Sequence, residues 1–213
     1  MTPRPRSRSR SVALARRGIA FEIGIWRSLA RWIVRRPSGV ASGAEPFGYA
    51  RMVAPLFWVF IVLSAVETVV AHVLLPWHAA QVASLVIGVW GLLWMLGLLA
   101  SLHVYPHLVT DDGLRVRYGA HLDVAVPWDA VRSVSAHRRD LPSQRSVQVV
   151  DTSAGAVLHV VIASQTAVDV VLDGPLTVQL PRRPVTVTQL RLHADDPRAV
   201  VAAARAHLAA RTT

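Results

Sequence analysis

Two long apolar runs occupy the middle of the chain and predict a helical hairpin. Residues 52–75 and 79–102 are almost free of charge, and each is 24 residues long. At about 1.5 Å per residue, a helix of this length crosses a hydrocarbon core of roughly 30 Å with some tilt. The short PWHA segment between them predicts a tight turn, where Trp77 suits a membrane interface. The pattern therefore predicts a two-helix transmembrane hairpin over residues 52–103.

Residues 12–36 repeat apolar and basic positions with helical spacing, which predicts an amphipathic helix. Such a helix lies in the lipid interface with its basic side chains toward anionic headgroups. The alternative, a helix packed on the protein's own cytoplasmic domain, stays open. The predicted apolar face holds Ile19, Ile23, Trp26, Leu29, Ala30 and Ile33, and the predicted membrane-surface residues are Arg16, Arg27, Arg31, Arg35 and Trp26.

Two polar segments flank this helix. Residues 1–11 consist of Arg, Ser and Pro apart from Met1 and Thr2, so they cannot bury a core, and we expect them to be disordered. Residues 37–51 are rich in Gly, Ser, Ala and Pro, which predicts a linker.

The period changes after the second apolar run, and residues 104–213 predict a β domain. Seven short valine-rich segments are bounded by Gly, Pro, Asp or Ser, as strands are. They are GLRVRYG, LDVAVPW, VRSVSAH, SVQVVDT, AVLHVVIA, LTVQL and PVTVTQLRL. The chain ends with a predicted helix, for which Asp195 or Asp196 is the cap and Pro197 the first residue. We therefore expect a small antiparallel barrel or sandwich closed by one C-terminal helix.

Composition supports a membrane protein. Of the 213 residues, 53% are hydrophobic, and the mean hydropathy is +0.39, which is more apolar than an ordinary soluble domain. All 23 basic residues are arginine, and arginine and alanine richness without lysine is typical of a bacterium with a GC-rich genome. The chain has no cysteine, which excludes disulfides and cysteine metal sites.

Charge predicts the orientation of the hairpin. Residues 1–51 hold eleven arginines against two glutamates, whereas residues 52–103 hold only Glu67. The positive-inside rule then places both termini in the cytoplasm of a multi-pass cell-membrane protein. Because the basic segment directly precedes an apolar hairpin, its charge favours anionic lipid headgroups over nucleic acid as the partner.

Residues 108–136, LVTDDGLRVRYGAHLDVAVPWDAVRSVSA, carry a resemblance to a known family. The Asp-Gly-Leu turn into an arginine-flanked strand, Gly119, and Val-Pro-Trp followed by alternating valines resemble bacterial membrane proteins with a pleckstrin-homology-like (PH-like) domain after two transmembrane helices. The resemblance covers roughly residues 50–210. It implies a membrane α + β protein with a cytoplasmic PH-like antiparallel β-barrel capped by a C-terminal helix. Arg115 and Arg117 are nearest to the basic residues that bind inositol phosphates in eukaryotic relatives, but no basic cluster follows them, and that specificity is not carried over.

Polar residues inside the hairpin predict a packed seam between its helices. If Leu75 pairs with Ala80, Glu67 lies opposite Gly88 at equal depth. Small residues at four-residue spacing let two helices approach closely, and a glutamate inside the hydrocarbon is costly unless it is covered. The role of Glu67 stays open between a structural hydrogen bond, an ion or proton path, and a contact with a partner helix. The predicted intramembrane polar contacts are Glu67, His72, Ser64, Thr68, Ser84 and Gly88.

The sequence indicates no catalytic or metal site and no cofactor. It contains no Gly-rich phosphate loop, no GxSxG and no HExxH. We expect a non-enzymatic membrane protein that presents its β domain to a protein or lipid partner, either as one copy or as a homo-oligomer. The alternatives are an accessory subunit of a transporter or channel that uses Glu67, and a membrane enzyme with an unrecognised site.

Overall fold

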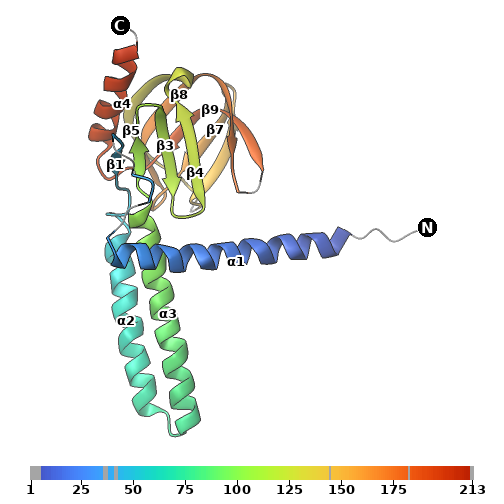
Figure 1. Ribbon diagram of the computed structural model, residues 1–213, viewed down its shortest axis with the longest axis vertical. Helices are drawn as coiled ribbons and strands as arrows, with labels where there is room; N and C mark the ends of the chain where they lie inside the picture. Colours follow the sequence, from blue (N-terminus) through green and yellow to red (C-terminus); the bar gives the residue numbers. More distant parts are fainter. Residues whose placement is uncertain (1–5, 36–37, 41–42, 144, 182, 212–213) are drawn as a thin grey trace, which may run out of the picture.

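Three parts of the chain follow one another along the long axis of the molecule in the computed structural model (Figure 1). A two-helix hairpin forms one end, a β domain forms the other, and a long N-terminal helix runs across the hairpin where the two parts meet. The structure describes residues 6–35, 38–40, 43–143, 145–181 and 183–211.

The hairpin consists of α2 (Ala54–Leu74) and α3 (His78–Val104). Pro55 lies in the first turn of α2, where its missing N–H would have had no intrahelical partner. Both helices are long and apolar enough to cross a membrane. Their ends lie within two residues of the predicted positions, so the hairpin prediction is confirmed at the level of its helices.

The N-terminal helix α1 (Arg6–Ile33) is longer than the sequence predicts. Disorder is expected for residues 1–11, but residues 6–11 are helical, and this boundary is corrected. Arginine is among the better helix formers, so an arginine-rich segment continues a helix that its apolar neighbours begin. Residues 1–5 lie outside the described part of the chain.

The β domain contains two sheets joined by the short helix η1 (Trp128–Ala130). The first sheet is wholly antiparallel, and its strands follow the order β1 (Glu45–Phe47), β2 (His107–Val109), β3 (Gly113–Tyr118), β4 (Leu122–Pro127). The second has the order β5 (Val131–Asp140), β8 (Gln165–Gln179), β9 (Pro184–Leu192), β7 (Gly155–Val160), β6 (Val147–Thr152).

Three features of the sheets differ from the prediction. β7 and β9 pair in parallel, so the second sheet is mixed rather than antiparallel. β8 begins at Gln165, well before the predicted LTVQL segment, and passes through a register shift between Val171 and Leu176. β1 forms inside the predicted linker because its backbone pairs with β2, a strand sixty residues later in the chain. These are all consequences of long-range pairing.

The core of the β domain lies between the two sheets and is closed by α4 (Pro197–Arg211). The predicted cap of this helix is confirmed, since the carboxylate of Asp196 accepts a hydrogen bond from the Ala199 N–H at 3.0 Å. The core is made of aliphatic side chains from both sheets and from one face of α4, and it includes Leu114, Val124, Val134, Leu158, Val170, Leu190, Val200 and Ala204.

Candidate membrane interface

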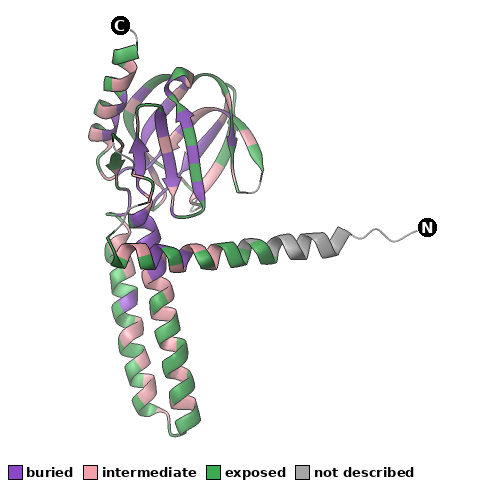
Figure 2. Ribbon diagram, in the orientation of Figure 1, coloured by how far each residue is buried: buried purple, intermediate pink, exposed green. Residues whose placement is uncertain are grey.

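The surface of the hairpin is apolar over most of its length. Figure 2 shows the lower parts of α2 and α3 as exposed or half-buried, in contrast to the buried strands above them. Water-soluble surfaces do not normally carry an apolar patch of this extent. The exposed side chains include Leu56, Trp58, Val59, Phe60, Val62, Leu63, Val66, Val69, Val70, Val73 and Leu74 of α2, and Val82, Leu85, Val86, Ile87, Val89, Trp90 and Leu93 of α3.

Small and polar residues line the seam between α2 and α3. A Cβ atom added to Gly88 would overlap the side chain of Thr68, so the two helices are in close contact there. The Thr68 hydroxyl donates to the Ser64 carbonyl at 2.7 Å, and the Ser84 hydroxyl donates to the Gln81 carbonyl at 3.0 Å. Both hydroxyls make their hydrogen bonds within their own helices. The contact between the two helices at Gly88 is therefore one of close packing.

The turn end of the seam carries further polar contacts of the hairpin. His72 Nδ1 lies 3.4 Å from the Gln81 carbonyl oxygen, and the Gln81 amide donates to the Leu75 carbonyl at 2.9 Å. The side chains of residues 72 and 81 thereby close the turn. The predicted polar contacts at His72, Ser64, Thr68, Ser84 and Gly88 all lie in or beside this seam.

Glu67 lies elsewhere. Its side chain is exposed on the outer surface of α2, so the prediction that it lies between the two helices is wrong. Successive helical residues differ in direction by about 100°, and the contact of Gly88 is with Thr68, one residue further along. That single step turns Glu67 from the seam to the surface.

One face of α1 packs against α3. A Cβ atom added to Gly97 would overlap the side chain of Ile25, which is itself fully buried. The Trp94 indole N–H donates to the Glu22 carboxylate at 3.1 Å, across the same contact. The sequence pattern shows Glu22 only as an interruption of an apolar run, because the partner lies seventy-two residues away.

A second face of α1 remains exposed and apolar. Ile19, Ile23 and Ile33 are all more than half exposed, while Leu29, predicted to lie with them, is buried. Trp26 belongs to the exposed stripe by its spacing, and its ring packs on Trp90 with a centroid distance of 5.0 Å. The predicted apolar face is therefore divided in two, one part against α3 and one part open.

The arginines of α1 lie beside this open face. Arg16 and Arg27 are exposed, and so is Arg35, which lies in the turn that follows α1. Arg31 is half-buried, and its guanidinium donates to the Ser38 hydroxyl at 2.5 Å and to the Tyr105 hydroxyl at 3.5 Å. Three of the four predicted surface arginines are thus exposed, whereas Arg31 joins α1 to Tyr105 at the end of α3.

A buried polar cluster connects the hairpin to the β domain. His107 Nε2–H donates to the His193 carbonyl at 2.9 Å, and its Nδ1 accepts from the Arg117 N–H at 3.0 Å, which defines a neutral ring. Burial lowers the pKa of His107 to about 4, and burial also raises the pKa of Tyr49, whose ring lies 4.7 Å from the imidazole. The Tyr49 hydroxyl accepts from the Gly119 N–H at 2.8 Å. The cluster fixes the base of the domain.

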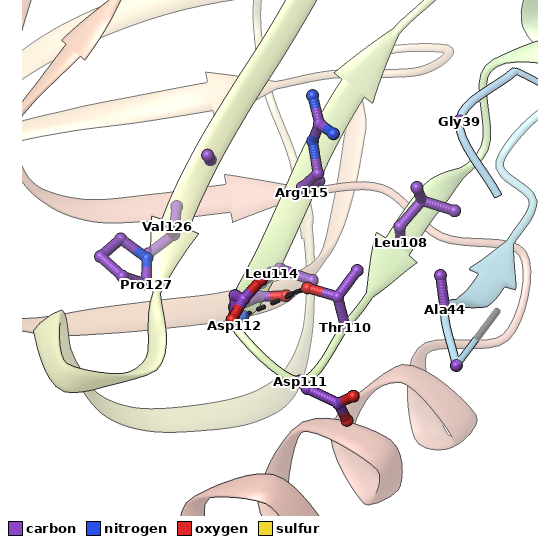
Figure 3. Close-up of a pocket in the computed structure, with 13 residues that line it drawn as sticks. Gly39, Ala44, Leu108, Thr110, Asp111, Asp112, Leu114, Arg115, Val126 and Pro127 are labelled. Carbon is purple, nitrogen blue, oxygen red and sulfur yellow. Dashed lines mark hydrogen bonds between the residues drawn. The ribbon is translucent and has the colours of Figure 1, made fainter. Parts of the chain in front are cut away.

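A cavity of about 550 Å³ opens on the outer side of the first sheet, between β1 and β4 (Figure 3). Its charged lining residues are Asp111, Asp112 and Arg115. Figure 3 shows Arg115 pointing away from the two aspartates, and its guanidinium pairs instead with Asp123 at 2.6 Å. The aspartates lie in an exposed turn that Thr110 closes through hydrogen bonds with Gly113. These groups have structural roles and converge on no common point.

Within the described residues, no group of three or more His, Asp or Glu side chains is arranged to hold a metal ion. The main features of the described residues are an exposed apolar hairpin, an amphipathic helix and a buried polar cluster at the junction with the β domain. No protein-family model matches the chain, and no curated protein and no solved structure matches it either.

Proposed function

We propose that the protein is a non-enzymatic integral membrane protein. In this proposal α2 and α3 cross the bilayer, α1 lies in its cytoplasmic interface, and the β domain, which we take to be PH-like, is presented to a protein or lipid partner in the cytoplasm. The observation that carries the proposal is the exposed apolar surface of the hairpin, which on α3 ends where α1 crosses it.

The dimensions of the hairpin support this placement. From His78 at the turn to Gly97 beneath α1, α3 rises about 28 Å, close to the roughly 30 Å of a hydrocarbon core. Beyond Gly97, α3 is largely buried by the protein itself. The exposed length of α3 thus corresponds to the thickness of one bilayer's hydrocarbon core, and α1 lies at the edge of that core.

The exposed face of α1 and the side opposite to it suit a position in the interface. Trp26 contacts Trp90, which lies further toward the turn than Gly97, so the stripe of Ile19 and Ile23 faces the same way as the hairpin's lipid-exposed part. On the opposite side of α1, Gly24 lies against Ala120 of the β domain. An apolar stripe toward the acyl chains with arginines at its border is the arrangement of an interfacial helix.

Single-cysteine labelling tests the proposal, because the chain contains no cysteine of its own. Nitroxides placed at Ile23→Cys and Val86→Cys in the full chain, reconstituted in vesicles, should be accessible to oxygen and protected from a water-soluble relaxation agent. A nitroxide at Val150→Cys, an exposed residue of β6, is the aqueous control. Equal accessibility of all three labels to the water-soluble agent contradicts the proposal.

The same approach tests orientation. In intact cells, a membrane-impermeant maleimide should label Ala79→Cys at the turn of the hairpin, and it should label Ser153→Cys in the β domain only after the membrane is opened. Both termini and the β domain are then cytoplasmic. Labelling of Ser153→Cys in intact cells contradicts that orientation.

A second candidate is an accessory subunit of a transport or channel complex. The exposed position of Glu67 favours it, since an acidic side chain facing lipid costs about 2.5–3.5 kcal/mol at mid-helix on insertion scales. A helix from a second copy or from another membrane protein would cover it. In this alternative the hairpin is a site of assembly as well as an anchor.

A further inference from the structure

A cationic cavity lies where the hairpin enters the β domain. It measures about 510 Å³ and is bordered by the residues that precede α2, by β5 and by the start of α4. These segments are far apart in the sequence, and each brings one arginine to the rim: Arg51, Arg138 and Arg198.

The three arginines are short of acidic partners. Among the described residues, no ion pair involves any of them. The Arg138 guanidinium donates to the neutral amide oxygen of Gln165, at 3.1 and 2.6 Å. The cavity thus holds cationic groups whose charge is open to an anion.

Two aspartates at the same cavity are engaged by the backbone. The Asp195 carboxylate accepts from the Arg51 N–H at 3.0 Å, and Asp196 is the cap of α4. Three arginines against two such carboxylates leave one positive charge, which matches a phosphodiester. The N-terminus of α4, a helix of fifteen residues, adds the positive end of its dipole.

A buried imidazole also faces this cavity. His193 is only 6% exposed and is one of the residues that line the cavity, and its Nδ1 has no hydrogen-bond partner among the described residues. Burial lowers its pKa, so the ring is a neutral group available to a ligand oxygen or hydroxyl. An unpartnered polar atom at this depth can receive a hydrogen bond from, or donate one to, a ligand that enters the cavity.

An apolar cavity continues from the cationic one toward the hairpin. It measures about 580 Å³, shares Arg51 and Asp195 with its neighbour, and extends along the first turns of α2. Its remaining lining is mostly hydrophobic and includes Trp58, which is 46% exposed. A charged cavity and an apolar cavity in this order correspond to the headgroup and the acyl chains of a lipid.

We propose that the two cavities together bind one anionic glycerophospholipid. Its phosphate lies among Arg51, Arg138 and Arg198 at the start of α4, and its acyl chains follow α2 past Trp58. The proposal rests on the proposed function, because a lipid in this orientation requires the hairpin to lie in the bilayer. A soluble phosphate would use only the cationic cavity and leave the apolar one without a role.

Binding to the purified full chain in a phospholipid-free detergent tests this proposal. After removal of native lipid, phosphatidylglycerol should bind with one-to-one stoichiometry by native mass spectrometry and should raise the melting temperature. Phosphatidylcholine should bind at least tenfold more weakly, and glycerol 3-phosphate should give no shift. Because the readout is binding in micelles, it does not depend on the depth and orientation measurements that test the proposed function.

Variants then locate the site. The combined change Arg51→Gln, Arg138→Gln and Arg198→Gln should weaken phosphatidylglycerol binding at least tenfold, whereas Arg132→Gln is the matched control, since Arg132 pairs with Asp173 and lines neither cavity. Trp58→Ala should weaken lipid binding without changing the melting temperature of the lipid-free protein.

Three outcomes overturn the proposal. The first is phosphatidylglycerol binding that is equal in the triple variant and in Arg132→Gln. The second is equal affinity for phosphatidylglycerol and phosphatidylcholine. The third is binding of glycerol 3-phosphate as tight as that of the lipid, with no effect of Trp58→Ala, which would identify a site for soluble phosphate.

Discussion

His107 is the residue on which the junction between hairpin and β domain depends. It is 1% exposed, and both ring nitrogens are used by backbone groups, one as donor and one as acceptor. Protonation would place a second donor against the Arg117 N–H, so the folded protein holds the ring neutral. His107 therefore has a structural role, and its protonation state affects the free energy of unfolding.

We therefore expect the protein to lose stability in mild acid. The pKa of His107 is about 4 in the folded state and about 6.5 when unfolded, so the unfolded chain binds more protons between these values. The stability that depends on the neutral ring is complete above pH 6.5 and is lost as the pH falls to 4, by about 3 kcal/mol. Melting temperatures of the full chain in detergent, taken from pH 7.5 to pH 4, measure it.

His107→Asn provides the comparison. This variant should be less stable at pH 7 because it loses buried hydrogen bonds, and its melting temperature should fall less between pH 6.5 and pH 4. His78→Asn, at the exposed turn of the hairpin, should keep the wild-type slope. A slope unchanged in His107→Asn would show that other groups cause the acid sensitivity.

At the scale of elements, glycines decide where helices meet. Gly88 and Gly97 each lie where a Cβ would overlap a neighbouring side chain, of Thr68 and Ile25 respectively, whereas nothing lies within 4 Å of a Cβ at Gly91. Overpacking costs about 1–3 kcal/mol, and alanine gains about 1 kcal/mol over glycine in helix propensity.

These values predict opposite effects for three similar changes. Gly88→Ala and Gly97→Ala should lower the melting temperature in detergent, the first by separating α2 from α3 and the second by displacing α1. Gly91→Ala should leave it unchanged or raise it slightly. Destabilisation of Gly91→Ala to the same extent would mean that helix packing is not what these glycines control.

Local patterns predict the elements of this protein well, and long-range pairings limit the rest. The apolar runs, the strands from β3 to β7 and the capped helix α4 all follow from the spacing of neighbouring residues. The position of Glu67 does not, because a rotation of one residue in α2 exchanges it with Thr68. The strand β1, the parallel pair of β7 and β9, and the bond from Trp94 to Glu22 each depend on a partner that only the fold brings near.

At the scale of the whole molecule, the exposed carboxyl group on α2 predicts self-association. A polar side chain facing lipid is stabilised by a polar contact with another chain, and two copies related by an axis along the membrane normal bring Glu67 to Glu67 at one depth. Leu63→Cys, one turn before Glu67, should form an intermolecular disulfide in membranes, and adding Glu67→Leu should reduce its yield. Val62→Cys is the control, because it is equally apolar and exposed but points about 140° away from Glu67.

Equal disulfide yields at positions 62 and 63 would contradict this assembly. A disulfide at neither position would leave Glu67 to a helix of a different protein, which is the expectation of the accessory-subunit alternative. Because the chain has no native cysteine, a disulfide between two copies can form only through the introduced residue.

The pairing of β1 with β2 has a mechanical consequence. Phe47 pairs with His107, so the segment that leads into α2 and the segment that leaves α3 are hydrogen-bonded to each other inside one sheet. A domain joined by one flexible connection can rotate about that connection. Rotation of this domain relative to the hairpin is opposed by two backbone segments that are hydrogen-bonded to each other. If the hairpin crosses the bilayer as we propose, the domain would keep a constant height and orientation above it, and a partner diffusing along the membrane would always meet the same side of it.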